Sequence, residues 1–467
     1  MKTLAHSAFA LLVTLLTIPQ LALAQSAELE ALVESIAAEH VGSSLAGLSV
    51  GVARGDQILF QKGYGHANLQ WQVPMPIDAV HEIGSVTKQF TTAAVLQLYG
   101  MEQLDLDADI NEYLPDFDTQ GRKISVRRLM DHTSGIKGFT EIPEFGEFSQ
   151  RTLPKETLLR LIEKQPYEFE PGEAMIYNNS AYFLLGLIIE AVSGQSFEDY
   201  VNDNIFVSAG MTNSSYCSNS ELVEKKAQGY QSTPEGLELA TYHDHTWPYA
   251  AGSLCSTVSD LLAWNQALHH GELLSPALYE MMITPVPLAD GTPIRYAMGV
   301  NHYQHTTGRV IEHGGGIDGF LSHSRFYPDE DVTIVVLQNT MAQPGPEAIT
   351  NQIGEQLFGS QEEPEAQTFS GDLSAYTGTY RGPARGTTYT ATVASDGGEL
   401  KLTIRAGPEE LWPRQYFATQ SLRYSGGNTF ARGNLRYIFE LAEGSDDESV
   451  LRIDSPGSHY VLRGYDD

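Results

Sequence analysis

The chain of 467 residues carries 28 Lys and Arg against 59 Asp and Glu, which gives a formal net charge of −31. With 42% hydrophobic and only 19% charged residues, the composition excludes a chain that is disordered as a whole. The acidic balance argues against nucleic acids and anionic membrane surfaces as partners, because both require basic patches. The length predicts two or three domains, or one large domain with an appendage.

The first 24 residues have the pattern of an export signal. Lys2 supplies the positive charge, the run from Phe9 to Ile18 is apolar, and Ala22-Leu23-Ala24 resembles a cleavage site before Gln25. The apolar run is short for a membrane span, and no later stretch reaches the ~18 apolar residues of a transmembrane helix. We therefore expect a periplasmic or secreted protein without a membrane span, with an uncleaved N-terminal anchor as the alternative.

Helical and strand-like patterns alternate through the first three quarters of the chain. An apolar rhythm from Ala27 to His40 predicts a helix, and the turn Arg54-Gly55-Asp56 predicts a hairpin. His269 and His270 end a later helical pattern, where their charge would complement the helix dipole. The predicted helices are Gly84–Tyr99, Asn179–Val192, Thr257–His269 and Pro346–Phe358, and the predicted strands are Gly47–Ala53, Gln57–Gly63, Arg309–His313, Gly319–Tyr327 and Val332–Asn339.

The last quarter of the chain differs in composition. Residues 359–371 contain several acidic residues, Pro364 and few large apolar residues, as is typical of a linker. Short alternating runs follow, separated by turn signals such as Asp396-Gly397-Gly398 and Gly426-Gly427-Asn428 and without helical segments, which predicts a small β-barrel or β-sandwich. The six predicted strands are Tyr376–Tyr380, Tyr389–Val393, Leu400–Ile404, Leu435–Leu441, Val450–Ile453 and Tyr460–Leu462. We therefore expect a signal peptide at 1–24, a main domain at 25–358, a linker at 359–371 and a small β-domain at 372–467.

Two cysteines, Cys217 and Cys255, follow the predicted signal peptide. An oxidising compartment permits a disulfide, but sequence spacing cannot establish its geometry. Cys255 ends the small, apolar stretch Gly252–Cys255 and is equally compatible with a buried free thiol. The sequence leaves both alternatives open.

A Ser-x-x-Lys motif, Ser85-Val86-Thr87-Lys88, opens a predicted helix. The spacing of three places Ser85 and Lys88 on adjacent turns of one face. An amine of depressed pKa can take the serine proton, and a helix N-terminus provides N–H groups where negative charge develops. A second copy, Ser134-Gly135-Ile136-Lys137, opens no helix, so the context favours Ser85 as a nucleophile.

A Tyr-x-Asn motif, Tyr177-Asn178-Asn179, follows a Pro-Gly turn and precedes an apolar helix. A tyrosine brought to the serine and lysine would act as a general base and later activate water. Asn179 would bind a substrate carbonyl or fix the lysine. Tyr200-Val201-Asn202 repeats the motif in an ordinary helix end, and a half-buried ring with a locally satisfied hydroxyl is the alternative for either tyrosine.

Three consecutive glycines follow His313, at the end of a predicted strand. Such glycines let a substrate backbone approach a sheet edge, and their N–H groups can stabilise an oxyanion. An ordinary glycine-rich turn is the alternative. A dinucleotide site is excluded because no helix follows, and the chain contains no Walker phosphate loop.

These elements, in this order, resemble the serine β-lactamase/penicillin-binding-protein-like superfamily, and within it the class C β-lactamase-like serine hydrolases and esterases. The resemblance covers about Ser43 to Phe358 and includes Leu129–Gly135, Ala251–Leu261 and Gly314–Phe320. It implies an α/β fold in which helices flank an antiparallel sheet and a helical subdomain bears Tyr177.

The resemblance also implies residues for each function at the site, and no metal or organic cofactor. Ser85 matches the acylated nucleophile, Lys88 its partner base, Tyr177 the general base, Asn179 the third member of Tyr-x-Asn, His313 the Lys of the family's Lys-Thr-Gly, and Gly316 the residue whose N–H joins that of Ser85 in the oxyanion hole.

His313 is a departure that bears on the substrate. A lysine there offers a permanent charge to a substrate carboxylate, whereas a histidine is charged only near or below a pKa of about 6.5. Gly314 also lacks the threonine hydroxyl. The resemblance therefore implies an esterase, amidase or D-amino-acid peptidase acting through an acyl-enzyme, with a β-lactamase or a non-turnover penicillin-binding or sensor protein as alternatives. Turnover of substrates that bear a free carboxylate is expected to fall above neutral pH more than turnover of neutral esters.

The β-domain resembles the lipocalin-like barrel of some relatives, which shapes the cleft or assembles oligomers, and an inert stabilising domain is the alternative. His243-Asp244-His245 has metal-ligating side chains but no third ligand at a suitable spacing, so we expect this loop at the rim of the cleft. The expected partner is a small-molecule or short-peptide substrate, and the β-domain leaves room for a homo-oligomer.

Overall fold

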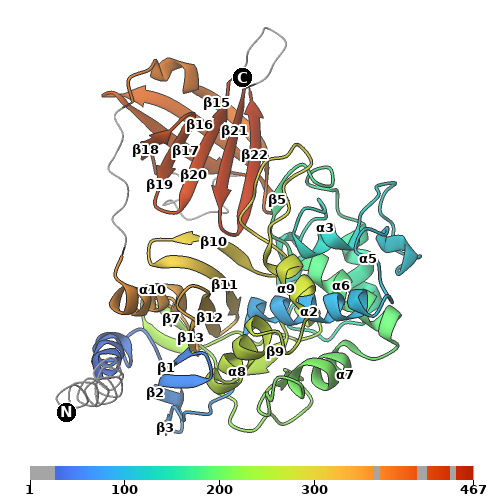
Figure 1. Ribbon diagram of the computed structural model, residues 1–467, viewed down its shortest axis with the longest axis vertical. Coiled ribbons are helices and arrows are strands. Elements are labelled where there is room, and N and C mark those ends of the chain that lie inside the picture. The colour runs from blue at the N-terminus through green and yellow to red at the C-terminus, as the bar shows by residue number, and fades with distance from the viewer. Residues whose placement is uncertain (1–26, 361–368, 408–417, 442–448, 466–467) are drawn as a thin grey trace, which may run out of the picture.

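The computed structural model describes residues 27–360, 369–407, 418–441 and 449–465. The predicted signal peptide and most of the predicted linker lie outside these residues. Figure 1 shows a layered α/β body with a β-barrel at one end of it.

A seven-stranded antiparallel sheet forms the centre of the α/β body. Its strand order is β10-β11-β12-β13-β1-β2-β3. The central strands β1 and β13 are almost entirely buried, because helices cover both faces of the sheet. The strands are β1 (Gly47–Arg54), β2 (Gln57–Asn68), β3 (Val73–Pro74), β10 (Asn301–His305), β11 (Gly308–Ile317), β12 (Phe320–Tyr327) and β13 (Val332–Gln338).

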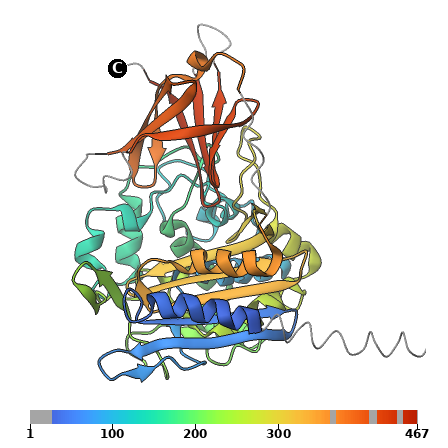
Figure 2. The same ribbon diagram turned by 90° about the vertical axis from the view of Figure 1, so that its left-hand side faces the viewer.

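Each face of this sheet carries its own hydrophobic core. On one face lie the helix of residues 27–40 and α10 (Pro346–Phe358), which run side by side in Figure 2. On the other lie α2 (Thr87–Gly100), α6 (Asn179–Ser193) and α8 (Val258–His269). These helices confirm the predicted ones to within a few residues. The shorter helices are α3 (Val126–Met130), α4 (Phe145–Phe148), α5 (Lys155–Glu163), α7 (Phe197–Val201) and α9 (Pro276–Ile283).

Helix α6 is the most apolar of these helices and is buried in the core between α2 and α3. In the described part of the chain, no single helix has the length and apolar composition of a membrane span. Helix α6 reaches that composition only together with Phe197–Phe206, from which it is separated by an 81° bend.

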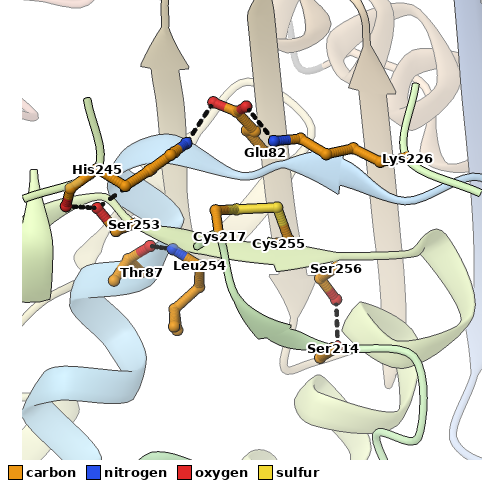
Figure 3. The surroundings of a disulfide bond; sticks show 10 residues. All are labelled: Glu82, Thr87, Ser214, Cys217, Lys226, His245, Ser253, Leu254, Cys255 and Ser256. Carbon is orange, nitrogen blue, oxygen red and sulfur yellow. Dashed lines mark hydrogen bonds and ion pairs between the residues drawn. A yellow bond between two sulfur atoms is a disulfide. The ribbon is translucent and has the colours of Figure 1, made fainter. Parts of the chain in front are cut away.

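Two small sheets flank the central one. The first joins β4 (His81–Glu82), β9 (Leu254–Ser256) and β6 (Ser215–Tyr216), and a disulfide between Cys217 and Cys255 ties its edge together (Figure 3). The structure thus pairs the two cysteines, which the sequence left open. The second joins β14 (Thr340–Met341), β7 (Tyr230–Thr233) and β8 (Gly236–Leu239).

The C-terminal region is a closed eight-stranded antiparallel barrel, because its first and last strands pair with each other. The sequence predicted six of these strands and missed β18 and β19. The last strand, β22, also pairs with β5 (Met175–Ile176) of the α/β body, directly before Tyr177. The barrel strands are β15 (Gly378–Ala384), β16 (Thr387–Asp396), β17 (Glu399–Ala406), β18 (Gln420–Gly426), β19 (Thr429–Arg432), β20 (Leu435–Glu440), β21 (Val450–Ser455) and β22 (Ser458–Gly464).

Candidate active site

Ser85 and Lys88 lie together where β4 leads into α2. A short turn of 3-10 helix, Gly84–Val86, holds Ser85, and Lys88 belongs to the first turn of α2. The Lys88 Nζ atom lies 3.1 Å from Ser85 Oγ, 2.8 Å from Asn179 Oδ1 and 2.7 Å from the carbonyl oxygen of Ala251. Asn179 is the first residue of α6, whose N-cap is Asn178. The structure therefore brings together Lys88, Asn179 and Ala251, which lie far apart in the sequence.

The environment of Lys88 favours an uncharged amine. The side chain is 0% exposed, and burial together with the nearby charge of Arg385 holds the pKa of Lys88 well below its usual value. A neutral amine has two N–H groups and one lone pair. The oxygens of Asn179 and Ala251 can only accept hydrogen bonds, so they take the two N–H groups and leave the lone pair facing the Ser85 hydroxyl.

Tyr177 lies beside this pair, at the end of β5. Its ring centroid is 4.8 Å from Lys88 Nζ, and its hydroxyl is buried without a regular hydrogen bond. Burial raises the pKa of Tyr177, and the Ser85 side chain lies near enough to oppose that effect. The ring of His132 packs on that of Tyr177 with centroids 4.3 Å apart. Tyr177 is therefore a phenol, suited to donate a proton rather than to accept one from the resting serine.

A close backbone contact places Gly316 beside the nucleophile. Gly84 has φ +48°, and a Cβ added to it would lie 2.8 Å from the nitrogen of Gly316. A Cβ on Gly315 would lie 2.0 Å from the oxygen of Ile83 and 3.0 Å from the nitrogen of Ser85. Only glycine allows strand β11 to approach so closely. Ser85 and Gly316 consequently line the same cavity.

His313 lies on β11 behind Tyr177, with ring centroids 6.0 Å apart, and is buried. Its Nδ1 lies 2.6 Å from the oxygen of Gly314, so this nitrogen donates, and Nε2, 3.1 Å from the Tyr296 hydroxyl, accepts. Burial, with a smaller effect of Lys88, lowers the pKa of His313 to about 3. The expectation that His313 gains a charge close to neutral pH is therefore wrong, because it assumed an exposed ring.

A cavity of about 170 Å³ opens beside Ser85. Asp318, whose side chain is 46% exposed, lies at its rim, with Oδ2 3.5 Å from His243 Nδ1. None of the described residues that line this cavity is a lysine or arginine. The lining residues are Gly84, Ser85, Phe139, Thr140, Phe145, Asn179, His243, Pro248, Ala251, Gly252, Gly316, Ile317 and Asp318.

Of the other candidates from the sequence, His243 lines this cavity, as expected for its loop, whereas Ser134, Tyr200 and His245 do not. Ser134 is buried in its turn, and the Tyr200 hydroxyl points toward Gln97. His243 and His245 pair with different acidic residues, Asp318 and Glu82, as Figure 3 shows for His245. Among the described residues, no group of three or more His, Cys, Asp or Glu is arranged to hold a metal ion.

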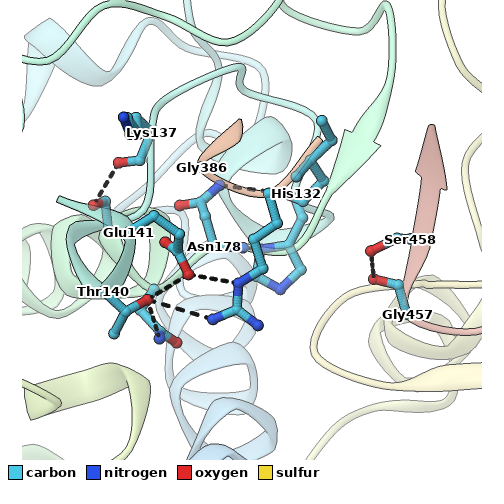
Figure 4. Close-up of polar contacts among 12 residues, drawn as sticks. His132, Lys137, Thr140, Glu141, Asn178, Gly386, Gly457 and Ser458 are labelled. Atoms are coloured by element: carbon cyan, nitrogen blue, oxygen red, sulfur yellow. Dashed lines mark hydrogen bonds and ion pairs between the residues drawn. The ribbon is translucent and has the colours of Figure 1, made fainter. Parts of the chain in front are cut away.

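Sequence reasoning missed a contribution from the barrel. Arg385, in the turn between β15 and β16, donates from Nε to Glu141 Oε1 at 2.6 Å and from Nη2 to Thr140 Oγ1 at 3.3 Å. Figure 4 shows Thr140, Glu141 and the neighbouring Gly386 gathered at this contact. The turn carries no motif that marks it as part of a site. The packing of His132 on Tyr177 was not predicted from the sequence either.

Comparisons with known proteins agree with this arrangement. The family model described as Beta-lactamase matches residues 30–356. Penicillin-binding protein 4* of Bacillus subtilis (strain 168) is 28% identical over 326 residues, which are 67% of this chain and 71% of that protein. A D-aminopeptidase of Gluconobacter oxydans (strain 621H) is 27% identical over 393 residues, which are 83% of this chain and 71% of that protein.

The likeness in fold extends across the barrel. The crystal structure of SurE superposes with a TM-score of 0.67 at 22% identity and covers 95% of this chain and 99% of that chain. The α/β body contains the whole stretch matched by the family model, together with the serine, lysine and tyrosine described above. The chain therefore belongs to the beta-lactamase family and is a serine hydrolase.

Proposed function

We propose that this chain is an exported hydrolase that cleaves an amide or ester of a D-amino acid through an acyl-enzyme on Ser85. The observation that carries the proposal is the geometry of Lys88, a dry amine whose two N–H groups are taken by carbonyl oxygens. Its lone pair is left for the Ser85 hydroxyl at 3.1 Å.

In the proposed reaction, Ser85 Oγ attacks the substrate carbonyl while its proton passes to Lys88 Nζ. The N–H groups of Ser85 and Gly316 stabilise the oxyanion. As the tetrahedral intermediate collapses, the Tyr177 hydroxyl gives its proton to the leaving group and recovers one from the Lys88 ammonium. Water then attacks the ester carbonyl, gives a proton to the restored base, and the acid product leaves as Ser85 regains its hydrogen.

The D-amino-acid substrate is proposed on two grounds. Relatives of the chain include D-aminopeptidases, such as that of Gluconobacter oxydans. The cavity beside Ser85 also carries the carboxylate of Asp318, two residues beyond Gly316, and no lysine or arginine among its described residues. A carboxylate that lines the same cavity as Ser85 and Gly316 suits the free ammonium of an amino acyl group.

Penicillin binding or β-lactam hydrolysis is the second candidate, favoured by the likeness to penicillin-binding protein 4*. We rank it lower because the neutral His313 and the absence of a hydroxyl at Gly314 leave fewer contacts for a β-lactam carboxylate.

Export is supported by the pattern of residues 1–24 and by the Cys217–Cys255 disulfide, since disulfides persist mainly outside the cytosol.

A fluorophosphonate probe followed by intact-mass measurement tests the nucleophile. One adduct is expected on the purified protein and none on Ser85→Ala. Ser134→Ala, which removes the serine of the second Ser-x-x-Lys, is the matched control and should still be labelled. Adduct formation on Ser85→Ala would refute the assignment.

A panel of substrates tests the reaction. We expect turnover of D-phenylalanine p-nitroanilide well above that of the L enantiomer and of the β-lactam nitrocefin. N-acetylation of the D substrate should lower kcat/KM, because it removes the ammonium that Asp318 would bind. Preferred turnover of nitrocefin would replace this proposal with the second candidate.

A further inference from the structure

Arg385 is the one residue of the barrel turn between β15 and β16 that carries a charge. Its guanidinium reaches the α/β body, where Cζ lies 5.4 Å from the centroid of the Tyr177 ring. The contacts to Glu141 and Thr140 use two of the five N–H groups that a guanidinium carries. The side chain is still 40% exposed, so part of the guanidinium faces solvent beside Tyr177.

Arg385 is connected to the nucleophile by an unbroken series of hydrogen bonds. Thr140 Oγ1, which accepts from Arg385, also accepts from Asn179 Nδ2 at 3.3 Å. Asn179 Oδ1 in turn accepts from Lys88 at 2.8 Å. The barrel therefore supplies a group that is fixed relative to the catalytic lysine.

The backbone of the turn is fixed as well. The Gly386 N–H donates to Glu168 Oε1 at 2.7 Å. Gly386 has φ +69°, and a Cβ there would lie 2.3 Å from the Cβ of Glu141. Because glycine alone fits this contact, the turn presents Arg385 in one defined position.

The other cationic groups near the nucleophile cannot serve a substrate anion. Lys88 is fully buried and holds a depressed pKa, and His313 is neutral. The described residues that line the cavity beside Ser85 include an aspartate but no lysine or arginine. Arg385 is thus a permanent, partly exposed cation at the Tyr177 side of the site, on a protein with a net charge of −31.

We propose that Arg385 is a specificity-determining residue that binds a carboxylate on the leaving group of a short peptide substrate. The assignment rests on the proposed function. Tyr177 gives its proton to the leaving nitrogen, and Arg385 lies over the Tyr177 ring rather than in the cavity that takes the acyl group. A guanidinium with free N–H groups suits a carboxylate because it can form two parallel charge-assisted hydrogen bonds.

Two peptides that differ only in this carboxylate test the proposal: D-phenylalanyl-glycine and D-phenylalanyl-glycinamide. On the full chain, kcat/KM for the acid should exceed that for the amide at least tenfold. Arg385→Gln should reduce this ratio at least tenfold. Arg381→Gln, which removes an exposed arginine of the same hairpin that lies over Tyr465, should keep the ratio. Equal losses for both peptides in Arg385→Gln would overturn the assignment and leave Arg385 a merely structural contact.

A binding measurement separates this proposal from the proposed function. In a Ser85→Ala background, calorimetry with the two peptides needs no turnover. The acid should bind at least tenfold more tightly than the amide, and Arg385→Gln should abolish the difference. If the unmodified protein cleaves neither peptide but this difference is present, the reaction is wrong and the carboxylate site stands. If the two peptides bind equally with Arg385 in place, the carboxylate site is wrong whatever the reaction.

Discussion

Three oxygen atoms lie within hydrogen-bonding distance of the Lys88 amine, and none of them belongs to a carboxylate. They are the oxygens of Ser85, Asn179 and Ala251. In a dry site, neutral partners of this kind favour the uncharged amine, and the positive charge of Arg385 adds to the effect. The charge of Glu141 opposes the lowered pKa of Lys88, but its effect is smaller than those of burial and Arg385. The residue that we propose as the base therefore also makes a pH-dependent contribution to stability.

Lys88→Met tests this link between the base and stability. Because the pKa of Lys88 is lowered in the folded protein, the unfolded chain binds an extra proton at neutral pH, and the folded state gains stability as the pH rises toward about 10.5. The free energy of unfolding of the unmodified protein, minus that of Lys88→Met, should increase between pH 7 and 10 by up to about 1.4 kcal/mol per pH unit. Urea unfolding at several pH values measures it, and a constant difference would mean that Lys88 is charged in the folded state.

Tyr177→Phe tests which step needs the phenol. A leaving amine must be protonated as the bond breaks, whereas p-nitrophenolate leaves without a proton. We expect kcat/KM to fall by roughly 10²–10⁴ for an amide and much less for a p-nitrophenyl ester. Tyr200→Phe, at the second Tyr-x-Asn, is the matched control. Equal losses for the two substrates would assign Tyr177 to activation of the serine instead.

How well each site residue could be predicted depends on how far along the chain its partners lie. Ser85 and Lys88 were predictable because three residues along a helix bring side chains together by geometry alone. Tyr177 was singled out by its Tyr-x-Asn motif, and the family resemblance distinguished it from the second copy of the motif at Tyr200. Arg385 was not predictable, because its partner Glu141 lies 244 residues away and the contact depends on how the barrel docks.

At the scale of elements, the contact between β11 and the turn at Gly84 decides whether an oxyanion site exists. Gly315 and Gly314 are adjacent in β11 but differ in surroundings. A Cβ on Gly315 would clash with the oxygen of Ile83 at 2.0 Å, whereas one on Gly314 would meet its nearest atom at 3.5 Å. The two positions thus form a matched pair within one strand.

Gly315→Ala should push β11 away from Ser85 and separate the two N–H groups that stabilise the oxyanion. We expect kcat to fall by roughly 10²–10³, the loss seen when one oxyanion donor is removed. Gly314→Ala should cost far less, since its added methyl group makes only an ordinary contact. Ester hydrolysis and thermal unfolding of both variants measure the effect. Similar activities for the two variants would contradict the assignment of this contact.

The elements themselves were predictable to different degrees. Helices α2, α6, α8 and α10 have apolar residues at helical spacing, and these residues are buried in the two cores. Their predicted bounds agree with the observed ones to within a few residues. In the barrel, β18 and β19 were missed although the Gly426-Gly427 turn between them was recognised. Short strands that pair across a barrel take their stability from neighbours far along the chain, and their own pattern is weak.

At the scale of the whole molecule, the barrel is a structural partner of the site. Strand β22 pairs with β5 directly before Tyr177, and Arg385 reaches Glu141. Further ion pairs cross the same boundary, from Arg295 to Asp454 and from Arg463 to Glu173. The sequence left open whether this domain shapes the cleft, assembles oligomers or only stabilises the chain. The contacts support the first alternative. The barrel pairs with β5 directly before Tyr177, and Arg385 of the barrel lies over the Tyr177 ring.

Buried histidines give the molecule a predictable response to acid. Burial lowers the pKa of six of them, so the expectation that His269 carries a charge at its helix end is wrong: its pKa falls to about 3. Four carboxyls act in the opposite sense: burial raises the pKa of Asp131 to about 6 and that of Glu168 to about 7, and it also raises the pKa of Glu198 and of Glu347. The six histidines are His81, His132, His269, His305, His313 and His323.

Below pH 6.5 the unfolded chain takes up protons on these histidines. In the folded state five of them take up a proton only at about pH 4 or lower, and burial holds the pKa of His132 well below its usual value. The stability that they contribute is therefore present above pH 6.5 and is lost as the pH falls. The six histidines outnumber the four carboxyls with a raised pKa, so unfolding is accompanied by a net uptake of protons, and the free energy of unfolding should fall between pH 6.5 and 4.5. Urea unfolding across this range measures the slope. His269→Gln, at a ring that stacks on Phe326 at 3.9 Å, should reduce the slope by about one proton. His270→Gln, at the exposed neighbouring ring, is the matched control, and an equal slope in His269→Gln and the unmodified protein would show that His269 protonates without unfolding.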